Sequence, residues 1–193
     1  MATLFYKQKD TKEGMKKMEK NKFTVVAFVG KSGAGKDYCA HKMLEDHPEN
    51  THFIVSSTTR PKRDYEIEGK DYHFLTEAEF AASTFVETAS FNGWHYGTRL
   101  GDLRLDRINV GVFNPTGIKT LAAQDNINLT IVYVKASDKT RLLRQLNREE
   151  EPNVQEIIRR FATDEADFKD DKAFITLGKG YHELWNDNRI GQE

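Results

Sequence analysis

An apolar segment that runs directly into a glycine-rich loop is the feature that most restricts the fold of this chain. Residues 23–30 (FTVVAFVG) are rich in β-branched side chains and end at glycine, which predicts a strand buried on both faces. Residues 30–36 (GKSGAGK) match G-x-x-x-x-G-K, and residues 37–47 (DYCAHKMLEDH) have the apolar spacing of a helix. A strand, a glycine loop and a helix in this order predict a phosphate-binding loop.

The chemistry of such a loop accounts for the pattern. Glycines allow backbone N–H groups to turn toward phosphate oxygens, and the helix N-terminus adds a partial positive charge. Lys36 is placed to reach the β- and γ-phosphates of a nucleotide. The expected ATP-binding residues are Gly30, Lys31, Ser32, Gly33, Ala34, Gly35, Lys36 and Asp37.

Asp37 stands where the motif usually has Ser or Thr, whose hydroxyl binds Mg²⁺. A carboxylate is also a hard oxygen ligand, so Asp37 is the one candidate ligand for a Mg²⁺ that accompanies ATP. An acidic residue in the first turn of a helix also interacts favourably with the helix dipole. Both interpretations remain open.

Four further segments are predicted strands, and each follows a helical stretch. Strands that alternate with helices predict an α/β fold of the P-loop NTPase type, with a parallel sheet covered by helices on both faces. The segments are residues 52–59 (HFIVSSTT), 108–114 (INVGVFN), 129–136 (LTIVYVKA) and 172–178 (KAFITLG).

One block breaks the alternation. Residues 76–79 (TEAE) have the form of a capping box, and Asn92-Gly93 predicts a hairpin turn within residues 84–98 (TFVETASFNGWHYGT). We expect an inserted subdomain in a parallel-sheet core. The expected organisation is a tail over residues 1–21 and a domain over 22–193, with core segments 22–56, 99–136 and 170–193, an insert over 57–98 and a helical lid over about 137–169.

Composition limits the partners. With 29 basic and 30 acidic side chains, the chain carries no electrostatic signature of binding a nucleic-acid polymer or an anionic membrane. The single cysteine, Cys39, cannot form an internal disulfide, and neither a transmembrane-length apolar run nor a signal-peptide core is present. We expect a cytoplasmic protein with small nucleotides as partners, and the sequence does not assign an oligomeric state.

The insert carries groups that suit a nucleoside monophosphate. The guanidinium groups of Arg60 and Arg63 and the phenols of Tyr72 and Tyr96 form a plausible grip on a phosphate monoester. A carboxylate such as that of Glu87 can accept hydrogen bonds from guanine N1 and N2, and small hydroxyls can complete the recognition of the base edge.

Two segments carry these groups: residues 54–80 (IVSSTTRPKRDYEIEGKDYHFLTEAEF) and residues 85–98 (FVETASFNGWHYGT). Both resemble the GMP-binding part of the guanylate kinase family. With the phosphate loop, the resemblance covers about residues 23–98. It implies transfer of the γ-phosphoryl group of ATP to GMP or dGMP, with Mg²⁺. It also implies that Arg60, Arg63, Tyr72 and Tyr96 hold the GMP phosphate, and that Ser56, Glu87 and Thr98 read guanine.

The resemblance also implies a lid with arginines that neutralise the phosphoryl group during transfer. Arg148 and Arg160 match the two lid positions, with Arg159 a close alternative to Arg160, and they join Lys36 and Arg60 as the expected catalytic residues. Ser137 is expected to cap the first lid helix, and Pro152 is expected to start the second.

The match fails at three places. Val112 and Asn114 stand where the family has acidic residues, and residues 174–178 (FITLG) lack the Asn-Asp pair that the family has beside the adenine. Asn114 with Pro115 also reads as a helix N-cap, and an Asn114 that instead faced the base would loosen the demand for guanine. Asn114 is therefore both a candidate NMP-binding residue and a candidate cap.

Two rival hypotheses remain open. The first is a broader deoxynucleoside monophosphate kinase, because the loop sequence GKD resembles that of some phage enzymes and Asn114 is compatible with looser base selection. The second is a non-catalytic guanylate-kinase-like module that binds a phosphorylated protein segment. Such modules usually lack an intact phosphate loop, so Lys36 and the lid arginines count against the second.

Overall fold

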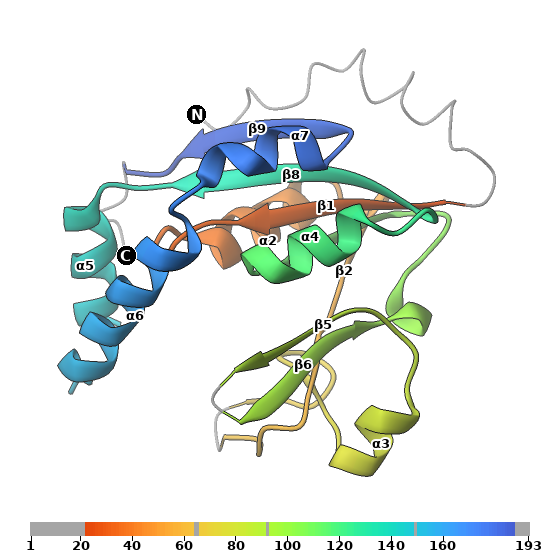
Figure 1. Cartoon of the computed structure of the whole chain (residues 1–193), viewed down its shortest axis with the longest axis horizontal. Coiled ribbons are helices and arrows are strands. Elements are labelled where there is room, and N and C mark those ends of the chain that lie inside the picture. Colours follow the sequence, from red (N-terminus) through yellow and green to blue (C-terminus); the bar gives the residue numbers. More distant parts are fainter. Residues whose placement is uncertain (1–21, 64–65, 92, 149, 188–193) are drawn as a thin grey trace.

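The computed structural model describes residues 22–187 except 64–65, 92 and 149, and the predicted tail, residues 1–21, lies outside the described residues. Its core is a sheet in the order β2-β7-β1-β8-β9, in which every neighbouring pair of strands is parallel. The fold is therefore the predicted α/β type (Figure 1). The strands are β1 (Phe23–Val29), β2 (Thr51–Phe53), β7 (Ile108–Val112), β8 (Ile127–Lys135) and β9 (Gly180–Trp185).

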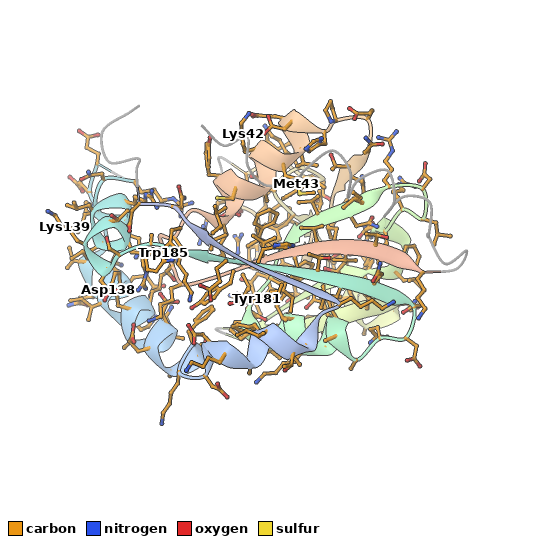
Figure 2. The ribbon with its side chains drawn as sticks, turned by 90° about the horizontal axis from the view of Figure 1, so that it is seen from above. Lys42, Met43, Asp138, Lys139, Tyr181 and Trp185 are labelled. Carbon is orange, nitrogen blue, oxygen red and sulfur yellow. The ribbon has the colours of Figure 1, made fainter. Side chains whose placement is uncertain are left out.

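Strand β1 is buried on both faces because alternate side chains enter two different apolar clusters. Val25 and Ala27 pack in the cluster that includes Ile118 of α4 (Pro115–Ala122). Val26 and Phe28 pack in the cluster that includes Ala40 of α2 (Lys36–Asp46). Figure 2 shows α2, marked by Lys42 and Met43, on one side of the sheet and the C-terminal helices on the other. The continuous apolar run of the sequence is explained by this double burial.

The insert forms a second, smaller sheet in the order β4-β3-β6-β5, drawn below the core sheet in Figure 1. Thr76 caps α3 with the predicted capping box, and β5 and β6 form the predicted hairpin. A short 3₁₀ helix, η1 (Leu100–Asp102), leads back to the core. The elements are β3 (Ser57–Thr58), β4 (His73–Phe74), α3 (Glu77–Ala82), β5 (Phe85–Phe91) and β6 (Trp94–Arg99).

The single strand predicted over residues 52–59 is wrong, because this segment is shared between the two sheets. Strand β2 ends at Phe53 beside β7, whereas β3 pairs with β4 and β6 of the insert. The partners of β3 lie up to 40 residues away (Ser57 to Gly97), so a local apolar pattern does not reveal the change of sheet.

The lid segment contains α5 (Asp138–Leu146) and α6 (Val154–Asp167). Ser137 caps α5 as predicted, through its hydroxyl and the N–H of Thr140. The prediction that Pro152 starts the second helix is wrong. The side chain of Asn153 accepts from the N–H of Glu156, so Asn153 is the N-cap and Pro152 lies before it.

The strand predicted over residues 172–178 is also wrong. The segment forms η2 (Asp171–Ala173) and α7 (Phe174–Leu177), and the edge of the sheet is occupied by β9 instead. The ring of Phe174 is buried against those of Phe168 and Tyr133. An apolar segment this short fits a helix over the sheet as well as a strand in it, and packing decides between them.

Within the described parts of the chain, no helix has both the length and the apolar character needed to cross a membrane.

Candidate active site

The predicted phosphate-binding loop lies between the end of β1 and the first turn of α2. Gly33 and Gly35 have φ of 77° and 89°, a region that side chains rarely adopt. A Cβ atom on Gly33 would also collide with the backbone of Arg141, and one on Gly35 with the amide of Asn186. Glycine at these two positions therefore allows a positive φ and also leaves room for Arg141 and Asn186 to lie close to the loop.

Residues from α5 and from the end of β9 hold the loop from its outer side. Arg144 Nη1 lies 3.3 Å from the carbonyl oxygens of both Gly33 and Ala34. Asn186 Nδ2 donates to the carbonyl of Ala34 at 2.9 Å, and its own carbonyl accepts from Arg144 at 2.6 Å. With the outer carbonyls bonded in this way, the loop is held independently of a bound nucleotide.

Lys36 is folded over this loop, with its ammonium donating to the carbonyl of Lys31 at 3.2 Å. Burial lowers the pKa of Lys36, and the charges of Asp37 and Asp164 oppose this effect. The cation of Arg160 also contributes to lowering that pKa, so the lid helix and the loop lysine are close enough to interact.

Asp37 is exposed in the first turn of α2, where its negative charge interacts favourably with the helix dipole. Among the described residues no group of three or more His, Cys, Asp or Glu side chains could hold a metal ion. Mg²⁺ usually takes only one or two carboxylates and completes its shell with water and substrate phosphates. A lone exposed carboxylate beside a phosphate loop fits that requirement, whereas Val112 offers no ligand.

Three of the four residues predicted to hold the acceptor phosphate form a cluster in the insert. The Arg60 guanidinium carbon lies 5.5 Å from the centre of the Tyr72 ring, and the Tyr72 and Tyr96 ring centres are 6.0 Å apart. Burial raises the pKa of Tyr72, and the charge of Asp37 adds to the rise.

Glu66 holds this cluster together. Its carboxylate accepts from Arg60 Nη2 at 2.6 Å and Nη1 at 3.1 Å, and from the backbone N–H of Arg63 at 2.8 Å. Hydrogen bonding to Arg60 lowers the pKa of Glu66, and the same bond raises the pKa of Arg60. The side chain of Arg60 is thereby directed by a buried carboxylate.

Glu87 and Thr98, two of the residues predicted to read the base, are bonded to each other. The Thr98 hydroxyl donates to Glu87 Oε1 at 2.9 Å, and both residues are buried. Burial raises the pKa of Glu87, with the hydrogen bonds of Thr98 opposing it. Ser56 is partly buried, and its carbonyl accepts from the N–H of His73.

Asn114 is the N-cap of α4, as its sequence with Pro115 predicted. Its Oδ1 accepts from the N–H of Gly117 at 2.7 Å. A Cβ atom on Gly117 would lie 3.3 Å from this oxygen and 3.1 Å from Glu87 Oε2. Asn114 therefore lies beside the Glu87 carboxylate, but its side-chain oxygen already accepts a hydrogen bond from the first turn of α4.

The two expected lid arginines differ in their surroundings. Arg148 is exposed beyond the end of α5. Arg160 and Arg159 both bond Glu156, at 2.9 Å for Arg160 and 2.7 and 2.8 Å for Arg159. Hydrogen bonds from Arg159 and then Arg160 lower the pKa of Glu156 to about 2. The structure thus brings Arg160, but not Arg148, into an ordered ion pair near the loop.

Residues 174–178 do lack an Asn-Asp pair, but the chain has such a pair further on. Asn186 and Asp187 directly follow β9. Asp187 accepts from the N–H of Ser137 at 2.7 Å, which lowers the pKa of Asp187. The pair thus joins the end of the sheet to the start of α5.

Sequence reasoning missed several residues that shape the site: Glu66, Arg141, Arg144, Glu156, Asp164 and Asn186. Asn186 follows the segment YHELW, whose apolar and polar residues do not alternate, so its position at the end of a strand depends on the pairing of that strand with β8. Glu156 could have been found from its i, i+3 and i, i+4 spacing to Arg159 and Arg160. Glu66 bonds Arg60 within the insert, whereas the partners of Arg141, Arg144 and Asp164 are set by the packing of α5 and α6 against the loop.

Comparison with known proteins places these features in a family. The sequence model described as guanylate kinase matches residues 22–177. The guanylate kinase of Homo sapiens is 32% identical over 160 residues, covering 76% of this chain and 78% of that protein. That of Frankia casuarinae is 46% identical over 92 residues, covering 46% and 49%. The crystal structure of guanylate kinase from Anaplasma phagocytophilum has a TM-score of 0.58 at 20% identity and covers 89% of this chain and 80% of that chain, which shows a shared fold.

Proposed function

The chain belongs to the guanylate kinase family, and on that basis we propose that it transfers the γ-phosphoryl group of ATP to GMP or dGMP. One observation carries the proposal beyond family membership. The Arg60 guanidinium is held by Glu66 beside the Tyr72 ring, 5.5 Å from its centre, and this cluster and the loop of Gly30 to Lys36 belong to different elements. The chain therefore offers two candidate phosphate sites, one for the donor and one for the acceptor, as phosphoryl transfer requires.

On the acceptor side, Arg60, Arg63, Tyr72 and Tyr96 hold the phosphate of GMP. Glu66 pre-orients Arg60, so less side-chain freedom is lost when the phosphate binds. Ser56, Glu87 and Thr98 recognise the guanine edge. The bond from Thr98 fixes one Glu87 oxygen, and the other carboxylate oxygen accepts from the base.

On the donor side, Gly30 to Lys36 surround the ATP phosphates, and Lys36 exchanges its bond to the Lys31 carbonyl for phosphate oxygens. Asp37 is the residue that would hold Mg²⁺, directly or through water. When bound, Mg²⁺ neutralises charge on the triphosphate. Asn186 and Arg144 hold the loop beside it in place.

An oxygen of the GMP phosphate attacks the γ-phosphorus as the bond from that phosphorus to the bridging oxygen of ADP breaks. No covalent enzyme intermediate is required. Arg60, Arg148 and Arg160 neutralise the charge of the group in transfer. Arg160 is held by Glu156 before the substrates bind, and phosphate oxygens replace that partner during the reaction.

The test is a coupled assay of ADP release with every common NMP and dNMP, using Lys36→Met as the inactive control. GMP or dGMP is expected to be the best acceptor. Equal turnover of several purine and pyrimidine monophosphates would reject the guanine assignment and favour a broad (deoxy)nucleoside monophosphate kinase. No turnover with any of them would reject kinase activity and leave the phosphoprotein-binding module.

The location and other partners follow from the same proposal. Small nucleotide substrates, a single cysteine and a nearly balanced charge support a cytoplasmic enzyme that binds neither nucleic-acid polymers nor membranes.

A further inference from the structure

Ser32 of the phosphate loop has both of its backbone polar groups bonded to an ion pair that sequence reasoning did not single out. Its N–H donates to Asp164 Oδ2 at 2.8 Å, and its hydroxyl lies 3.2 Å from Oδ1. Its carbonyl accepts from Arg141 Nε at 2.9 Å. Arg141 Nη2 in turn donates to Asp164 at 2.6 Å, so the three residues close a ring of hydrogen bonds.

This ion pair is removed from water. The side chains of Arg141 and Asp164 are only 1% and 10% exposed, and the Arg141 guanidinium lies 4.4 Å from the centre of the Phe161 ring. Desolvation of a buried pair often cancels the attraction within it, so apolar replacements of both residues are frequently neutral for stability. Stability alone is therefore a weak reason for two charges at this place.

The pair also links the loop to both lid helices. Arg141 belongs to α5, and its backbone is the surface against which Gly33 packs. Asp164 belongs to α6, one helical turn after Arg160. A shift of α6 that displaced Asp164 would thus release the N–H of Ser32, and a shift of the loop would move the helix that carries Arg160.

We propose that Arg141 and Asp164 are positioning residues for ATP binding, which hold the phosphate loop at Ser32 and tie its geometry to the lid helix. This inference rests on the proposed function, because it concerns how the loop receives ATP. Both act through the loop, so their loss affects ATP much more than GMP.

The first experiment compares Asp164→Ala with Asp138→Ala. Both changes remove a carboxylate that bonds Arg141, at 2.6 Å in each case, but only Asp164 contacts the loop. Asp138 is a suitable control because its side chain is 76% exposed, at the outer side of α5 (Figure 2). Asp164→Ala is expected to raise the ATP Michaelis constant about tenfold, within the range usual for coupled sites, and to leave that of GMP nearly unchanged. Asp138→Ala is expected to change neither.

A second variant separates positioning from folding, because Asp164→Ala leaves a buried arginine unpaired and can unfold the protein. Arg141→Met/Asp164→Leu removes both charges and is expected to melt near the wild-type temperature while retaining the raised ATP Michaelis constant. A double variant whose Michaelis constant for ATP equals that of the wild type overturns the inference. An equal rise in the Michaelis constants for ATP and GMP also overturns it.

The wild-type protein in the same assay distinguishes failure of the positioning role from failure of the proposed kinase function. If the wild type phosphorylates GMP and the Asp164 variants bind ATP normally, only the positioning role fails. If the wild type transfers no phosphoryl group, the proposed function itself fails. Binding of ATP measured by calorimetry then still compares the variants without turnover, and equal dissociation constants reject the positioning role independently.

Discussion

Glu66 bonds both terminal nitrogens of Arg60, with contacts of 2.6 and 3.1 Å, and is itself only 7% exposed. A bidentate bond fixes the plane of the guanidinium group, which a single contact does not. The orientation of Arg60, which we propose to hold the acceptor phosphate, is therefore set by a carboxylate within the same loop.

Glu66→Gln is expected to raise the Michaelis constant for GMP roughly tenfold, because loss of a charge-assisted bond of about 1.5–3 kcal/mol releases Arg60. The variant also removes a negative charge near the phosphate, which acts in the opposite direction. We expect orientation to dominate, since the rest of the grip depends on it. Glu68→Gln is the control, because Glu68 is exposed and bonds His73 and Phe74 instead. Tighter GMP binding in Glu66→Gln would show that charge dominates.

Arg60→Ala is expected to weaken GMP binding and slow turnover far more than Lys62→Ala. Removing a charged partner from a desolvated phosphate contact costs about 2–5 kcal/mol. Lys62 lies between the two arginines, but it is exposed and donates to the carbonyl of Glu66 at 2.9 Å. Steady-state kinetics with varied GMP make the comparison, and similar constants for the two variants would reject the acceptor assignment.

Asp37→Asn is expected to raise the Mg²⁺ concentration for half-maximal activity and to change the GMP Michaelis constant little. Asn keeps the size of the side chain and removes its charge. Asp37→Ser supplies the hydroxyl of the common motif and is expected to recover much of the metal affinity. If Asp37 only interacts with the helix dipole, Asp37→Asn is expected to lower the free energy of unfolding by about 0.3–1 kcal/mol and to leave the Mg²⁺ titration unchanged.

Glu87→Gln is expected to become more stable relative to the wild type as the pH rises. Burial raises the pKa of Glu87 above the 4.5 of an unperturbed glutamate. The stability contributed by this group is fully present below about pH 4.5 and is lost as the pH rises through the raised folded pKa. Glutamine has no such dependence. Melting temperatures of both proteins between pH 4.5 and 7.5 measure the difference, and a constant difference contradicts the raised pKa.

Asn114→Ala is expected to lower the free energy of unfolding by about 0.5–2 kcal/mol, through loss of the cap of α4. Asn114→Asp keeps a capping oxygen and is expected to be near neutral for stability. The preference for GMP over AMP should survive in Asn114→Ala. A large loss of that preference in a folded variant would assign Asn114 to the base instead of the helix.

Local patterns were sufficient where neighbouring residues decide the structure. The glycine loop, the buried β1, the capping box at Thr76 and the cap at Asn114 were all read correctly, because each depends on residues within one or two turns. The same local information misplaced the last strand. Residues 174–178 and 181–185 are both short and partly apolar, and only packing on β8 selects the second as β9.

The sequence by itself determined the alternating α/β order and the strand, glycine loop and helix at residues 23–46, and it predicted a phosphate loop and an acceptor site, since each depends on local spacing and chemistry. Only the tertiary structure decided that Arg141 and Asp164 hold Ser32 and that Arg144 and Asn186 hold Ala34. The bond between Glu156 and Arg160, by contrast, follows from i, i+4 spacing on one helix. The bond from Ser32 to Asp164 spans 132 residues. Such a pairing depends on how the helices pack on the sheet. The local sequence around a charged side chain does not indicate which distant group that side chain will bond.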